Sequence, residues 1–119
     1  MFNRPIRNML VETGSSPSAE MLQCYRELIS RPDHVTGTLK MMAGWDLADQ
    51  RQVLPSLRTP LHLVVCTNDR TVSPWQSERL SEFVTCSKLY RVPDLGHLGH
   101  EEDPTPFADI IRAALPAKI

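Results

Sequence analysis

The hydrophobic pattern divides the chain into two parts that meet near residue 60. In the first part, Ser16-Pro17 has the form of a helix cap followed by proline at the first helical position. Apolar side chains then recur at helical spacing until Arg31-Pro32, which ends the predicted helix. Its apolar positions are Met21, Leu22, Tyr25, Leu28 and Ile29.

A second helix is predicted from Asp33, which can cap it, to about Gly44. Its apolar positions are Val35, Leu39 and Met42. Residues 45–60 are predicted to be a connector that can hold a short helix. Because no strand pattern occurs in this part, we expect its regular structure to be helical.

The second part alternates between strand and helix patterns. Residues 61–66 form a short aliphatic run, which is typical of a parallel strand buried on both faces. Ser73-Pro74 begins a helix, and Gln76 is placed to complete a capping box. The pattern of residues 87–92 predicts a second strand that is more polar than the first, and Asp103-Pro104 begins a last helix. The inward side chains are predicted to be Leu80, Phe83 and Val84 in the first of these helices, and Phe107, Ile110, Ile111, Ala114 and Leu115 in the second. This order of elements predicts an α/β fold with two parallel strands joined by a right-handed crossover.

Composition and charge exclude several classes of protein. With 119 residues the chain makes at most one modest domain, and its 41% of hydrophobic residues is enough for a core. Thirteen basic and fourteen acidic residues leave a net charge of −1, which argues against a nucleic-acid-binding protein or a polybasic membrane-surface protein. No apolar run approaches the roughly 18 residues of a spanning helix, and the first residues lack a secretory signal pattern. We therefore expect a cytoplasmic protein without a membrane span.

The three cysteines, Cys24, Cys66 and Cys86, are widely spaced and form no Cys-x-x-Cys pair. This spacing suggests neither a disulfide framework nor a zinc site. We expect reduced thiols that are buried or half-buried.

Two polar residues follow the two predicted strands. Asp69 comes just after the first strand, and His97 lies in a turn after the second. Because the carboxyl ends of neighbouring parallel strands meet at one edge of a sheet, the two side chains are expected to lie side by side. An aspartate beside a histidine can fix the imidazole tautomer and make it a general base. Either residue alone is more simply an ordinary loop residue; together they favour catalysis.

Two other groups of residues have alternative interpretations. His97, His100, Glu101 and Glu102 include chemically capable metal ligands, but their spacing fits no zinc motif, so no metal and no cofactor are expected. His100, Glu101 and Glu102 are better explained as support for the His97 loop or as the start of the last helix. The other group, Met41, Met42 and Trp45, can line a pocket for a flat apolar substrate, or simply pack against a core.

Residues 57–115, with Leu-His-Leu-Val-Val-Cys-Thr-Asn-Asp and Val-Pro-Asp-Leu-Gly-His, resemble the acid and histidine segments of an α/β-hydrolase domain. The resemblance implies that Asp69 is the acid and His97 the base of a Ser-Asp-His triad. The stretch Met-Met-Ala-Gly-Trp-Asp-Leu at residues 41–47, with Glu-Thr-Gly-Ser at 12–15, is similar to one subgroup, the magnesium-chelatase accessory proteins of bacteriochlorophyll synthesis. Residues 1–56 are then part of a helical cap with a connector, and residues 57–119 the C-terminal part of the hydrolase core.

The chain departs from the family pattern in two ways. Cys66 stands where glycine is usual, three residues before the acid, and no Gly-x-Ser-x-Gly occurs; Gly14-Ser15-Ser16 follows no predicted strand. We therefore expect a C-terminal part of a protein of roughly twice this size or more, inactive alone in serine-type ester hydrolysis. The alternative is a non-enzymatic accessory that binds a tetrapyrrole for magnesium insertion and associates with the chelatase.

Overall fold

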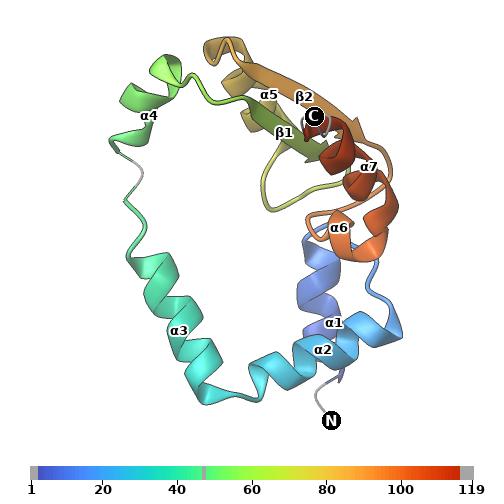
Figure 1. Cartoon of the computed structure of the whole chain (residues 1–119). Helices are drawn as coiled ribbons and strands as arrows, with labels where there is room; N and C mark the ends of the chain where they lie inside the picture. The colour runs from blue at the N-terminus through green and yellow to red at the C-terminus, as the bar shows by residue number, and fades with distance from the viewer. Residues whose placement is uncertain (1–2, 47, 116–119) are drawn as a thin grey trace.

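The computed structural model describes residues 3–46 and 48–115. Helices make up the first half, and strands alternate with helices in the second (Figure 1). The elements in chain order are α1 (Asn3–Glu12), α2 (Ala19–Ile29), α3 (Pro32–Ala43), α4 (Gln50–Val53), the short 3-10 helix η1 (Leu54–Ser56), β1 (Leu61–Cys66), α5 (Pro74–Phe83), β2 (Ser87–Val92), α6 (Gly99–Glu102) and α7 (Pro104–Ala114).

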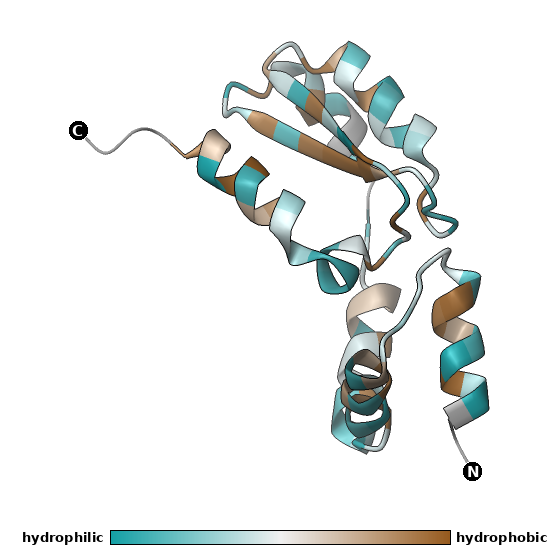
Figure 2. Cartoon of the chain, turned by 90° about the vertical axis from the view of Figure 1, so that its right-hand side faces the viewer, coloured by the Kyte–Doolittle hydropathy of each residue, from teal (hydrophilic) through white to brown (hydrophobic). Residues whose placement is uncertain are grey.

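The two strands form a parallel pair, with Leu61 opposite Ser87 and Cys66 opposite Val92. Both predicted strands are confirmed with their predicted bounds. Helix α5 makes the crossover between them and lies on one face of the pair, while α7 lies on the other (Figures 1 and 2). The carboxyl ends of both strands therefore open toward the same side of the molecule.

The buried hydrophobic side chains form two small groups. Val65, Cys66, Val84 and Val92 are buried in the strand region, and Ile6, Leu10 and Met21 are buried among the first helices. Of the side chains predicted to face inward from α5, Val84, which directly follows the helix, is 1% exposed as expected, whereas Phe83 is 58% exposed, so that prediction is wrong. Ile111 in α7 and Leu115, which directly follows it, are also exposed. A two-stranded sheet offers too little apolar surface to cover both helix faces.

The first helix was not predicted. Its two buried side chains, Ile6 and Leu10, are one helical turn apart, too short a pattern to identify a helix from sequence. Helix α2 starts two residues later than expected, with Ser18 rather than Ser16 as its cap. The Ser16 N–H instead donates to the distant Glu102 carboxylate, which holds this residue outside the helix.

Helix α3 confirms the second predicted helix, but Asp33 lies in its first turn and is not its cap; Arg31 occupies the N-cap position without a side-chain hydrogen bond. It extends away from the sheet (Figure 1), and its predicted apolar face is largely exposed: Leu39 is 62% and Met42 52% exposed. The short helices α4 and η1 occupy the predicted connector. Leu47, in the connector, lies outside the described residues.

The caps of the last two long helices differ from each other. Ser73 caps α5 without a side-chain bond, so the predicted capping box is wrong; the Gln76 N–H donates to the Ser73 carbonyl instead. Asp103 caps α7 as expected, accepting the Thr105 N–H at 3.0 Å.

Within residues 3–46 and 48–115, no helix has both the length and the apolar character needed to cross a membrane.

Candidate active site

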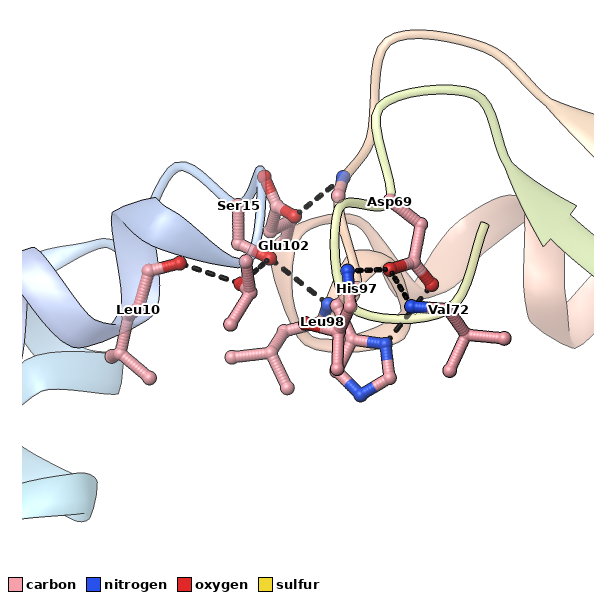
Figure 3. Close-up of polar contacts among 10 residues, drawn as sticks. Leu10, Ser15, Asp69, Val72, His97, Leu98 and Glu102 are labelled. Atoms are coloured by element: carbon pink, nitrogen blue, oxygen red, sulfur yellow. Dashed lines mark hydrogen bonds and ion pairs between the residues drawn. The ribbon is translucent and has the colours of Figure 1, made fainter. Parts of the chain in front are cut away.

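Asp69 and His97 meet beyond the carboxyl ends of β1 and β2 (Figure 3). The chain stays paired past the sheet, because the Thr67 N–H donates to the Val92 carbonyl and the Asn68 N–H to the Leu95 carbonyl. The two loops therefore leave the sheet side by side. Their side chains join through a 2.9 Å contact between Asp69 Oδ2 and His97 Nδ1.

Asp69 is held as a carboxylate. Its Oδ1 accepts the N–H groups of Thr71 at 2.8 Å and Val72 at 2.9 Å, and its side chain is only 14% exposed. Burial by itself raises the pKa of this carboxyl group, but the hydrogen bonds from His97, Val72 and Thr71 outweigh burial and leave the pKa below its ordinary value of 3.8. Asp69 is therefore negatively charged at neutral pH.

The geometry selects one tautomer of His97. Because Asp69 is ionised and can only accept, the His97 Nδ1 atom facing it carries the proton. In the neutral ring, Nε2 is then free of its proton and can accept one. The His97 side chain is 35% exposed, so a reacting group can reach it. The pair has the electronic arrangement of a general base with its orienting carboxylate.

Residues 13–16, which follow α1, complete the surroundings of the pair. The Thr13 carbonyl oxygen accepts both the Arg70 N–H at 3.0 Å and the His97 N–H at 3.3 Å, so one atom bridges the two loops. Gly14 has a φ of +85°, and a Cβ atom there would lie 1.8 Å from the Asn68 carbonyl oxygen. Glycine is required at this close approach. The Glu-Thr-Gly-Ser stretch carried part of the subgroup resemblance, but no pattern in the sequence indicated its place beside Asp69 and His97.

The hydroxyl of Ser15 takes part in the contact between residues 13–16 and the His97 loop. Ser15 is 3% exposed, and its Oγ accepts the Leu98 N–H at 2.9 Å. Thr13 Oγ1 lies 2.6 Å from the Leu10 carbonyl and 3.0 Å from Ser15 Oγ. The single Thr13 proton goes to the carbonyl, which can only accept, so the Ser15 hydroxyl donates to Thr13. Ser15 thus links the His97 loop to the end of α1.

The acidic residues of α6 tie the same regions together. Glu102 accepts the Gly96 N–H at 3.0 Å through Oε1 and the Ser16 N–H at 2.8 Å through Oε2. Glu101 accepts the Tyr25 hydroxyl at 3.0 Å, and its other neighbour is His100 at 3.7 Å. Glu102 therefore contacts the His97 loop as expected from the sequence. In the described part of the chain, no three His, Cys, Asp or Glu side chains form a group that could hold a metal ion.

The structure does not bring Met41, Met42 and Trp45 to this site. They lie at and after the end of α3 and are 56%, 52% and 60% exposed, respectively. Figure 1 shows α3 on the opposite side of the molecule from α6. If these side chains bind a substrate, they do so without contacting His97.

The cysteines differ in exposure. Cys24 is exposed, contrary to expectation, whereas Cys86 is half-buried and Cys66 is buried. Burial, followed by the nearby charges of Asp69 and Glu102, raises the pKa of the Cys66 thiol. Cys66 is the last residue of β1 and pairs with Val92 in regular register, so cysteine in place of the usual glycine leaves the strand intact.

Two comparisons with known proteins show what this chain is similar to. The sequence profile of the alpha/beta hydrolase family matches residues 7–110. A curated relative, the Magnesium-chelatase 30 kDa subunit of Rhodobacter capsulatus, is 38% identical over 96 residues, which are 81% of this chain and 34% of the relative. The chain spans about a third of the length of the relative it matches.

Proposed function

The chain belongs to the alpha/beta hydrolase family, and on that premise we propose that it supplies the acid and the base of a serine-type catalytic triad. The substrate is a small molecule with an ester or acyl bond. The observation that carries the proposal is the 2.9 Å hydrogen bond between Asp69 Oδ2 and His97 Nδ1. In this proposal residues 57–119 are the part of the hydrolase core that carries the acid and histidine loops, and residues 1–56 are part of its cap.

The geometry of the pair supports the following roles. His97 Nε2 takes the proton of a serine hydroxyl while the serine oxygen attacks the substrate carbonyl. Asp69 stays ionised and stabilises the imidazolium that results. The imidazolium then returns the proton to the leaving group, and water releases the acyl group in a second cycle.

In this proposal the nucleophile comes from outside these 119 residues. The sequence contains no Gly-x-Ser-x-Gly, and the Ser15 hydroxyl is already bonded to Leu98 and Thr13. Without a nucleophile and oxyanion-hole donors, we expect the chain alone to be inactive, because these groups provide the covalent route and most of the charge stabilisation.

The test is a reconstitution. The chain is mixed with the part of the Rhodobacter capsulatus relative that it does not cover, and hydrolysis of a p-nitrophenyl ester is followed. We expect turnover only in the mixture, and loss of turnover with Asp69→Asn or His97→Ala. Turnover by the chain alone, or a mixture unaffected by His97→Ala, would overturn the proposal.

A second candidate is a non-enzymatic role in magnesium insertion, as a tetrapyrrole-binding partner of magnesium chelatase. It is favoured by the similarity to a protein named as a chelatase subunit and by the exposed Met41, Met42 and Trp45. Sulfur and aromatic side chains suit a flat apolar ligand. Protoporphyrin titration followed by tryptophan fluorescence separates the two roles. Tight binding that survives His97→Ala but not Trp45→Ala, without ester turnover, supports the accessory role.

A further inference from the structure

Glu102 joins two segments that are far apart in the sequence. One carboxylate oxygen accepts the Gly96 N–H at 3.0 Å, and the other accepts the Ser16 N–H at 2.8 Å (Figure 3 shows the contact with the His97 loop). Gly96 directly precedes His97 and is buried against the 13–16 segment: a Cβ atom there would lie 2.3 Å from the Ser15 nitrogen. The carboxylate thus acts where the His97 loop meets that segment.

Three consecutive N–H groups of the His97 loop are held from outside the loop. Glu102 accepts from Gly96, the Thr13 carbonyl accepts from His97 at 3.3 Å, and Ser15 Oγ accepts from Leu98 at 2.9 Å. Of the three, only Glu102 brings a charge, and a charge-assisted hydrogen bond is roughly twice as strong as a neutral one. Glu102 also fixes the 13–16 segment through the Ser16 N–H. That segment provides the other two acceptors, the Thr13 carbonyl and Ser15 Oγ.

We propose that Glu102 is a positioning residue for His97: by clamping Gly96 to Ser16, it holds the loop so that the His97 Nδ1–H points at Asp69. The inference rests on the proposed role of His97 as the base. Glu102 does not touch the imidazole and acts only through the loop that carries it.

The chemistry of the clamp requires a carboxylate with two accepting oxygens. In Glu102→Gln, the amide nitrogen replaces one oxygen and faces an N–H donor, so one of the two bonds is lost and two donors oppose each other. In Glu102→Asp, both oxygens remain but the side chain is one methylene shorter, so the variant retains the chemistry and partly restores the clamp.

Glu101 provides a matched control from the same turn of α6. Its carboxylate accepts the Tyr25 hydroxyl from α2 rather than an N–H of the His97 loop. Glu101→Gln removes the same charge one residue away and leaves the clamp in place.

The experiment measures the His97 Nδ1 proton of the full chain by nuclear magnetic resonance. The resonance is identified by its loss in Asp69→Asn, and its exchange with water is compared among the wild type and the Glu101 and Glu102 variants. Losing a hydrogen bond to a charged group is expected to raise the exchange rate roughly tenfold or more in Glu102→Gln. We expect a smaller rise in Glu102→Asp and a wild-type rate in Glu101→Gln.

Backbone amides of residues 61–66 report whether the fold survives. The proposal is supported when the His97 proton exchanges faster with water in Glu102→Gln while the strand amides stay protected. An unchanged His97 rate in Glu102→Gln overturns it, and so does a general loss of protection in that variant, since Glu102 would then have only a structural role. No substrate is used, so failure of the ester assay, which tests the proposed function, leaves this result unaffected.

Discussion

Gly14 lies in backbone contact with Asn68: a Cβ atom on Gly14 would stand 1.8 Å from the Asn68 carbonyl oxygen. Asn68 directly precedes Asp69, so the end of α1 is packed against the loop that carries the acid. The segment that follows α1 is therefore part of the site's support.

Gly14→Ala is expected to destabilise the fold. The residue has a φ of +85°, and holding alanine in this region costs about 1–3 kcal/mol before the clash is counted. Gly37→Ala is the control, because a Cβ atom there meets nothing within 4 Å and the residue lies inside α3. Alanine at a helical position should be about 0.5–1 kcal/mol more favourable than glycine. Urea unfolding measures the free energy of unfolding of both variants. Equal changes in Gly14→Ala and Gly37→Ala would contradict the close contact between Gly14 and Asn68.

Asp69 should make the fold sensitive to acid. Its pKa is lowered in the folded state: burial raises it, but the hydrogen bonds from His97, Val72 and Thr71 outweigh burial. The folded chain therefore binds this proton more weakly than the unfolded chain. The resulting stability is present above the ordinary value of 3.8 and is lost as the pH falls through the lower folded value.

The corresponding measurement is the free energy of unfolding at a series of acid pH values. Below pH 3.8 the wild type should lose stability more steeply than Asp69→Asn, which has no carboxyl group to protonate. Asp109→Asn is the control, since that carboxylate is 67% exposed on α7 and forms a surface pair of little energetic weight with Arg112. Parallel curves for the wild type and Asp69→Asn would refute the prediction.

Cys66 and Gly99 should be energetically coupled. A Cβ atom on Gly99 would lie 2.6 Å from the Cys66 sulfur, so Gly99→Ala forces a shift in a buried region and is expected to cost about 1–3 kcal/mol. Cys66→Ala removes the sulfur and makes room for the new methyl group. The double variant should therefore be more stable than the sum of the single changes predicts, by about 0.5–3 kcal/mol. A complete cycle of urea unfolding tests this, and additivity of the two changes would exclude the coupling.

The elements that the sequence predicted are those determined by local patterns. The aliphatic run at 61–66 and the strand at 87–92 have the predicted bounds, and the expected fold class and family are confirmed. The meeting of Asp69 with His97 could be predicted from the parallel strands, because such strands end at one edge. The catalytic roles of the two residues remain predictions.

The support of the site could not be predicted, because it depends on contacts between distant segments. Ser16 looks like a helix cap, yet its N–H donates to Glu102, 86 residues away. Thr13 contributes a backbone carbonyl, which any residue type carries and no sequence pattern reveals. The exposed faces of α3, including Leu39, show the same limit, since helical periodicity identifies a face but not what covers it.

The contact between Tyr25 and Glu101 should appear in an alkaline titration. Burial, followed by the hydrogen bond to Glu101 and its negative charge, raises the pKa of Tyr25 from 10.0 to about 12. In Glu101→Gln only burial and a weaker neutral contact remain, so the pKa should fall from about 12 but stay above 10.0. Phenolate absorbance measures the change, with Tyr25→Phe subtracted to isolate this residue. Glu27→Gln, on the same helix as Tyr25 and bonded to Gln23, should leave the titration unchanged.

The raised pKa also gives the sign of the stability change. The folded chain holds the Tyr25 proton more tightly than the unfolded chain, so this stabilisation is complete below pH 10.0 and is lost as the pH rises through about 12. Glu101→Gln should therefore weaken the alkaline loss of stability. A Tyr25 titration identical in the wild type and Glu101→Gln would show that α2 and α6 are not joined by this hydrogen bond in solution.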